Sequence, residues 1–363
     1  MMKSSLTFLI IIISSVVFSQ IGDVRRAPCF TKAAERLGKK YVNWECKDGD
    51  NIVDCNENLE VDQDSKLVLT RTSGNPYSGD CETCHMNGLR ERLVHFSGGK
   101  VDGIDTTYYQ SGCPQVVRNH IVGQENGRWT FYNDTSGLVA WHINYLNGAK
   151  HGQSIFYRQY KTGTEKFKIT IDNADRFIEY AIYQNDTFKI ENYANGLLDG
   201  LKTDYYLDSR VKTEINYKAG LFDGAYIEYT YEGNILQERL YKQGKKEGEW
   251  KYYYNDGNLL KTENWADDVK EGTFKSFYIQ GHIQSLETYK KGMKHGEFIE
   301  RFPDNKLKRQ AYYKKDELIE NHVFDEYGNE IETFGGDKSK GKTEDDEVPT
   351  TKSKKWWQFW KKG

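Results

Sequence analysis

The chain has 363 residues, of which 37% are hydrophobic and 14% aromatic, with 26 tyrosines, 33 glycines and 5 prolines. A chain that is poor in aliphatic residues but rich in tyrosine and glycine is typical of many short strands joined by tight turns. The formal net charge of −3 gives no general affinity for nucleic acid, so nucleic-acid binding is not expected.

The N-terminal segment has the pattern of an export signal. One lysine precedes an apolar run from Leu6 to Phe18, which is shorter than the ~20 residues of a membrane-spanning helix. Val17 and Ser19 are small residues in the positions that precede a cut before Gln20. We therefore predict a signal peptide over residues 1–19 and export to the periplasm, the outer envelope or the medium. An uncleaved N-terminal membrane anchor is the alternative.

Residues 20–76 are interpreted as an N-terminal cap that contains cysteines. An exported chain can form disulfides, and all six cysteines lie in the first third of the sequence. Cys46 and Cys55 flank "KDGDNIVD", which has the composition of a tight hairpin, so this pair is expected first. The disulfide candidates are Cys46, Cys55, Cys81, Cys84 and Cys113.

A repeat occupies residues 77–334. The second glycine of the motif G-x-x-x-G recurs every 24 residues at Gly200, Gly224, Gly248, Gly272 and Gly296, and earlier copies at spacings of 24 or 25 are Gly79, Gly103, Gly127 and Gly152. Aromatic residues follow this glycine at offsets of two and five, and a turn glycine often follows at nine, as at Gly257. One copy, centred near Arg176, has lost both glycines. Each unit thus predicts strand, turn, strand, turn.

A single hairpin is marginally stable in water, so the units are expected to stack. The predicted fold class is all-β: an elongated, single-layer, antiparallel array of about ten β-hairpin units of 24 residues. Identical offsets place aromatic side chains in rows along the sheet. We expect these rows to form a binding surface, and the expected anchors are Trp129, Tyr226, Trp250, Phe274 and Phe298.

The stretches "YKQGKKEGEWKYYYNDG", "YKKGMKHGEFIERFPDN" and "YANGLLDGLKTDYYLDS" resemble the bacterial variant of the MORN repeat, Y-x-x-G-x-x-x-G-x-x-x-x-Y-Y-x-x-G. The resemblance implies a β-array that serves as an interaction scaffold. Many bacterial members are described as antitoxin components of toxin–antitoxin pairs, which is an alternative function that requires residues 1–20 not to direct export. Asp268 stands where a glycine is expected. This departure and the degenerate unit near Arg176 predict a kink or an irregular stretch.

The chemical motifs are few. "CETCH", from Cys81 to His85, matches the attachment signature of c-type haem, and Cys81, Cys84, His85 and Cys113 have the donor set of a zinc site. Because the motif falls on a predicted strand, disulfides are the favoured interpretation, with Cys113 joined to Cys81 or Cys84. A haem- or metal-binding redox protein remains the alternative.

No catalytic motif is recognised, and we expect no enzyme activity and no cofactor. The slot before the repeat glycine is acidic in several units, and these side chains are interpreted as solvated turn positions: Asp199, Asp223, Glu247 and Glu271.

The repeat pattern stops after Phe334. Residues 335–353 have the composition of a disordered linker, and residues 354–363, "KKWWQFWKKG", form a basic aromatic tail. Tryptophan and lysine together favour the membrane–water interface, so the tail predicts contact with a membrane surface or with a partner's groove through Trp356, Trp357, Phe359 and Trp360. The predicted function is an exported, non-enzymatic β-repeat scaffold that binds a protein partner or an envelope surface.

Overall fold

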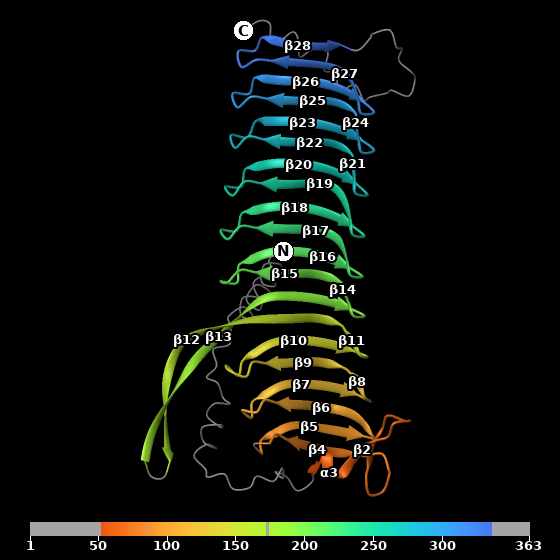
Figure 1. The fold of residues 1–363 in the computed structure, drawn as a ribbon, viewed down its shortest axis with the longest axis vertical. Coiled ribbons are helices and arrows are strands. Elements are labelled where there is room, and N and C mark those ends of the chain that lie inside the picture. The colour runs from red at the N-terminus through yellow and green to blue at the C-terminus, as the bar shows by residue number, and fades with distance from the viewer. Residues whose placement is uncertain (1–51, 87, 172–173, 336–363) are drawn as a thin grey trace, which may run out of the picture. The chain divides into compact units, whose positions relative to one another are not determined.

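The computed structural model describes residues 52–86, 88–171 and 174–335 (Figure 1). The predicted signal peptide, most of the predicted cap, the predicted linker from residue 336 and the basic aromatic tail lie outside the described residues. The described part of the chain contains no helix that is long and apolar enough to cross a membrane.

The described residues are almost entirely β-structure. Twenty-six strands are assigned to one sheet, and two more form a small second sheet. Successive strands along the chain pair in antiparallel fashion, and the one parallel pair in the described region is that of β1 (Ile52–Asp54) with β4 (Gly79–Cys84). The prediction of an all-β array of antiparallel hairpins is therefore confirmed.

The elements before the array form a small cap. They are β1, the four-residue helix α3 (Cys55–Asn58) and the hairpin of β2 (Leu59–Val61) with β3 (Val68–Thr70). Leu59 packs in a buried apolar cluster with Cys81, Val94 and Phe96 of the first array strands. Because its side chains come from several elements and are buried against one another, this cluster is a small hydrophobic core of the usual kind.

The chain divides into two compact units. The first runs through the cap and the array to Leu259 and includes Trp265–Asp268, and the second comprises Leu260–Asn264 and the chain from Val269. β20 (Leu259–Ala266) contributes residues to both.

The array strands of the first unit follow one another in chain order (Figure 1). After β4 they are β5 (Arg90–Ser97), β6 (Lys100–Tyr108), β7 (Pro114–Ile121), β8 (Gln124–Glu125), β9 (Gly127–Tyr132), β10 (Val139–Leu146), β11 (Ala149–Lys150), β12 (Gly152–Ile171), β13 (Ala174–Ala194), β14 (Leu197–Leu198), β15 (Gly200–Tyr205), β16 (Val211–Lys218), β17 (Leu221–Tyr229), β18 (Ile235–Lys242) and β19 (Lys245–Tyr253).

The second unit continues the same hairpin pattern. Its remaining strands are β21 (Val269–Lys270), β22 (Gly272–Phe277), β23 (Ile283–Lys290), β24 (Met293–Lys294), β25 (Gly296–Arg301), β26 (Leu307–Lys314), β27 (Glu317–Phe324) and β28 (Glu330–Gly335).

The turns at one edge of each ladder contain two residues. Between β18 and β19 both turn residues have positive φ, 50° at Gln243 and 83° at Gly244. This is the geometry of a type I′ turn, whose twist matches that of the paired strands. The first glycine of the sequence motif therefore adopts a left-handed backbone conformation at the turn. Most residues other than Gly, Asn and Asp disfavour this conformation.

Each of these turns is hydrogen-bonded to the preceding repeat. The Gly220 N–H donates to the Leu198 carbonyl at 2.8 Å, and the Gly244 N–H donates to the Phe222 carbonyl at 2.7 Å. The Gln243 N–H also donates to the Asp223 carboxylate at 3.3 Å. The acidic slot thus lies at a turn, as expected, and it also makes a contact between repeats that the sequence did not indicate. Four more acids make the same contact: Asp102, Asp199, Glu247 and Glu271.

The irregularity expected at Asp268 is absent. Asp268 adopts φ of 68°, its N–H donates to the Lys246 carbonyl at 3.1 Å, and its carboxylate accepts the Lys246 N–H at 2.8 Å. Aspartate tolerates the left-handed region better than most residues, and the second hydrogen bond compensates for the conformational cost. The prediction of a kink was therefore wrong at this position.

The degenerate unit near Arg176 does depart from the pattern. It forms a long hairpin of β12 and β13, which have 20 and 21 residues. β10 pairs with β12 at Ile155 and Phe156, and β15 pairs with β13 at Lys189 and Ile190. Farther out, the described pairings of the two strands are with each other alone, and Figure 1 shows the hairpin leaving the ladder.

Candidate functional site

The aromatic rows exist, but they are packed inside the structure. In the first unit the ring centroids of Tyr217, Phe222, Tyr241, Trp250 and Trp265 follow one another at 5.0, 5.1, 5.0 and 6.0 Å. In the second unit Phe274, Tyr289, Phe298 and Tyr313 follow at 5.2, 5.7 and 4.7 Å. Such ring pairs stabilise neighbouring repeats beyond the area that they bury.

Lysine side chains cover these rows. The Lys246 ammonium lies 4.8 Å from the Trp250 ring centroid and 4.1 Å from that of Trp265. Lys270 and Lys294 hold the same position over the rings of the second unit. Each ammonium is attracted to the faces of two rings, while its alkyl stem shields them from water.

Three of the five rings that we expected to anchor a partner are therefore poorly placed for that role. Trp129, Trp250 and Phe274 are 8%, 3% and 9% exposed, and Tyr226 and Phe298 are half-buried. The sequence pattern predicts rows of aromatic rings, but it does not indicate which neighbouring side chains cover them. We assign no binding role to the three buried rings.

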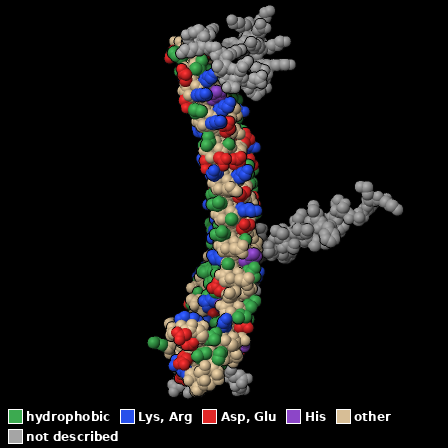
Figure 2. Space-filling view, turned by 90° about the vertical axis from the view of Figure 1, so that its right-hand side faces the viewer, with side chains coloured by type: hydrophobic (Ala, Val, Ile, Leu, Met, Phe, Trp, Pro, Cys, Tyr) green, Lys and Arg blue, Asp and Glu red, His purple; other side chains and the backbone are tan. Residues whose placement is uncertain are grey.

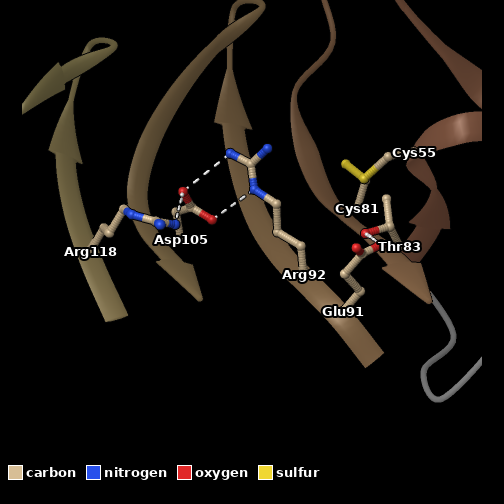
Figure 3. A network of polar contacts seen from close by, with 7 residues as sticks. All are labelled: Cys55, Cys81, Thr83, Glu91, Arg92, Asp105 and Arg118. Carbon is tan, nitrogen blue, oxygen red and sulfur yellow. Dashed lines mark hydrogen bonds and ion pairs between the residues drawn. A yellow bond between two sulfur atoms is a disulfide. The ribbon is translucent and has the colours of Figure 1, made fainter. Parts of the chain in front are cut away.

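The cysteines form a structural link at the cap. Cys55 is joined to Cys81 by a disulfide with a Cα–Cα distance of 5.2 Å (Figure 3). The expected Cys46–Cys55 pair is thus wrong, because the parallel pairing of β1 with β4 brings the end of β1 beside Cys81. Cys84 is also disulfide-bonded, whereas Cys113 is a free, buried thiol and is not joined to Cys81 or Cys84.

This arrangement does not fit a haem or zinc site at "CETCH". The Cys81 sulfur is bonded to Cys55 and is not available for a thioether or as a thiolate ligand. His85 is held through its Nε2 at 2.9 Å from the Tyr108 carbonyl. Among the described residues no group of three or more His, Cys, Asp or Glu side chains is placed to hold a metal ion.

A buried carboxylate on the neighbouring strands is likewise structural. Asp105 accepts hydrogen bonds from Arg92 at 2.8 and 3.1 Å and from Arg118 at 3.3 Å (Figure 3). Asp105 is 3% exposed, and both of its oxygens are paired with guanidinium groups. These ion pairs join β5, β6 and β7 and leave no oxygen free to act as a base.

A groove of about 590 Å³ lies in the second unit. Its floor contains Ser276 of β22 and Ser285 of β23, which are directly opposite each other and joined by a 2.6 Å hydrogen bond between their hydroxyls. The aromatic residues Tyr278, Phe298 and Phe302 also line the groove.

Small side chains at this cross-strand pair hollow the surface. In the other repeats the equivalent pair is larger: Thr107–Val116, Phe131–Trp141, Asp204–Thr213, Glu228–Gln237 and Glu300–Arg309. The Phe131 and Trp141 rings, for example, stack at 5.0 Å and fill the place that is empty above Ser276. The two serines stand out when the repeats are aligned with one another in the sequence. The predictions from the sequence did not single them out.

The charged side chains that line the groove have a positive excess. Four basic side chains, Lys294, Arg301, Lys308 and Arg309, face two acidic ones, Glu287 and Glu300. The Lys308 ammonium and an Arg309 guanidinium nitrogen lie 3.6 and 3.8 Å from the Glu300 carboxylate. The groove therefore favours a ligand that carries negative charge.

The second acidic side chain of the groove, Glu287, is hydrogen-bonded to a tyrosine. The Tyr289 hydroxyl donates to Glu287 at 2.7 Å. Burial of the ring, together with this hydrogen bond, raises the pKa of Tyr289, so the hydroxyl keeps its proton at neutral pH. Glu287 is thus engaged in a structural contact within the repeat.

The surface elsewhere is mixed. On the face that Figure 2 shows, basic, acidic and apolar side chains are interspersed along the chain, and no large region of one type dominates. The groove is distinguished from this background by its hollow floor and by its excess of basic side chains.

Comparison with known families supports the repeat resemblance in part of the chain. Residues 246–267, 270–291 and 294–315 match a family model described as "MORN repeat variant". The third matched stretch contains Phe298, Arg301 and Arg309 of the groove. The match identifies a repeat and names no activity, so it does not support an antitoxin role.

No curated protein matches the chain. Among solved structures, a chain in "Crystal Structure of TcdB2-TccC3" is similar at 10% sequence identity with a TM-score of 0.13. The match covers 75% of the present chain and 20% of that chain, so the protein spans about a fifth of the length of the solved relative.

Proposed function

We propose that the protein is a non-enzymatic scaffold whose groove in the second unit binds an acidic segment of a partner protein, and that it acts after export. The observation that carries this proposal is the Ser276–Ser285 pair, which lines the groove at a place where the equivalent cross-strand pairs of other repeats have larger side chains. MORN-type repeats are generally interaction repeats, which is compatible with a scaffold.

The chemistry of the groove supports binding more than catalysis. Both of its acidic side chains are engaged, Glu287 with the Tyr289 hydroxyl and Glu300 with basic side chains. A catalytic acid or base needs a free position near a reacting atom. Basic side chains beside Tyr278 and Phe302 instead suit a peptide with acidic and apolar residues.

The test is capture of a partner from an envelope fraction with the full chain and with the Ser276→Phe variant. Phenylalanine occupies the equivalent position at Phe131 and Phe156, so the variant is expected to fold while its groove is filled. A partner that binds the native groove is lost from the variant and retained by a control substitution at the exposed Leu207. Equal capture by all three proteins would place binding elsewhere.

The proposal of export is tested separately. We expect residues 1–20 to carry a reporter that is active only outside the cytoplasm. Failure of this fusion would restrict the scaffold to the cytoplasm without affecting the groove.

A further inference from the structure

The sequence that follows the last strand contains a stretch whose charge is opposite to that of the groove. The sequence "EDDE", Glu344–Glu347, contains four consecutive acidic residues. The groove has four basic side chains against two acids, and Glu300 already contacts Lys308 and Arg309. The charges of the two are therefore complementary.

The length of chain between them is sufficient for contact. β28 ends at Gly335 and pairs with β27, which pairs with β26, which pairs with β25 of the groove. At about 4.8 Å per strand, β28 lies about 14 Å from β25. The residues from 336 to 344 reach up to about 30 Å when extended. All of these strands belong to the second unit.

We propose that Glu344–Glu347 docks in the groove of the same chain and competes there with the partner. This inference rests on the proposed function of the groove. A tethered segment has an effective concentration on the order of millimolar, so even a weak contact keeps the groove occupied until a tighter partner displaces it. The scaffold is thus self-inhibited. Its apparent affinity for the partner is set by the difference between the binding free energies of the partner and of the tethered segment.

A peptide in solution reports whether the groove is occupied. The probe is a fluorescent peptide with the sequence of residues 340–351, and its binding is measured by anisotropy at low ionic strength. The proteins are the full chain and a full-length variant in which Glu344, Asp345, Asp346 and Glu347 are changed to the matching amides. We expect the peptide to bind the amide variant at least about 10-fold more tightly, because that groove is vacant.

Two controls assign the binding to the groove. Ser276→Phe, added to the amide variant, is expected to abolish peptide binding by filling the hollow. Lys308→Glu in the same background leaves the floor intact and is expected to weaken binding by reversing one charge of the lining. A peptide with the four acids replaced by amides is expected not to bind either protein.

The outcomes separate this inference from the proposed function. Equal binding to the full chain and to the amide variant overturns self-occupancy but leaves the groove as a partner site. Binding that survives Ser276→Phe, or no binding to any protein, shows that this acidic sequence does not use the groove. The capture experiment with the Ser276→Phe variant decides the proposed function independently.

Discussion

The side-chain amide of Asn216 donates a 3.0 Å hydrogen bond to the main-chain carbonyl of Ala225, the residue that follows Gly224. Gly224 has φ of 110°, and the pairing of β16 with β17 changes register there. The amide therefore binds a carbonyl that the strand ladder leaves unpaired. The same contact recurs between Asn119 and Arg128, Asn144 and Gln153, Asn192 and Leu201, and Asn264 and Thr273.

Asn216→Ala is expected to destabilise the surrounding hairpins by about 1 kcal/mol, because a partly buried carbonyl loses its donor. The measurement is faster amide hydrogen exchange in β16 and β17. Asn216→Thr is the matched control, since Thr288 donates from its hydroxyl to the Glu297 carbonyl at the equivalent place. Equal exchange in the alanine and threonine variants would show that the hydrogen bond contributes nothing.

Asp268 provides a test of the turn chemistry. Asp268→Ala is expected to cost about 2 kcal/mol, because alanine is strained at φ of 68° and the Lys246 N–H loses its acceptor. Asp268→Gly loses the acceptor but relieves the strain, so its cost should be smaller by about 1 kcal/mol. Urea denaturation followed by circular dichroism compares the two, and a larger loss in the glycine variant would contradict this account.

Trp250→Ala is expected to destabilise the first unit by about 3–5 kcal/mol, since the ring is 3% exposed and contacts Tyr241, Trp265 and Lys246. Leu207→Ala, at a side chain that is 70% exposed, should change stability by less than about 0.5 kcal/mol. The midpoint of urea denaturation is the measurement. A Trp250 variant that is as stable as the native chain would restore the ring as a candidate surface anchor.

The terminal strand is expected to be sensitive to pH. His322 of β27 contacts Glu320 through Nε2 at 2.9 Å and Glu330 of β28 through Nδ1. The hydrogen bond with Glu320, followed by that with Glu330, raises the pKa of His322. The charged clamp therefore stabilises β28 fully below the ordinary imidazole pKa of about 6.5 and is lost as pH rises through the raised value.

The acid limit of the same clamp is set by Glu330. Hydrogen bonds from Thr333 and then from His322 lower the pKa of Glu330, so its contribution is lost as pH falls through that lowered value. Protection factors of the β28 amides should thus decrease from pH 6 to pH 8.5 in the native chain. The decrease should be absent in His322→Gln, and a decrease of equal size in both proteins would exclude the clamp.

The period of the repeat made most of the array predictable. Glycine at the turn positions and aromatic residues at constant offsets indicate hairpins of one size, and the structure has them at Gly220 and Gly244. The contacts between repeats were not predictable in the same way. That Asp223 accepts the N–H of Gln243, twenty residues later, depends on how one turn lies against the next.

The candidate site was harder to predict from the sequence than the fold was. Aromatic residues mark the rows, but their exposure depends on lysines such as Lys246 and Lys270, which look like ordinary solvated charges in a sequence. The Cys55–Cys81 link depends on a parallel strand pair that no local pattern indicates. The groove depends on the small size of Ser276 and Ser285. Sequence motifs are defined by residues that are present, so the absence of a large side chain is not detected by them.

In most of the described repeats a turn N–H bonds to the carbonyl twenty-two residues earlier, as Gly244 does to Phe222, and this regularity has a consequence for how such a chain can change its length. The regular repeats offer their neighbours the same main-chain donors and acceptors, so duplication or loss of one whole 24-residue segment among them preserves these junctions, whereas a change of a few residues breaks one. Growth in whole modules moves a local feature such as the Ser276–Ser285 hollow relative to the ends without rebuilding it.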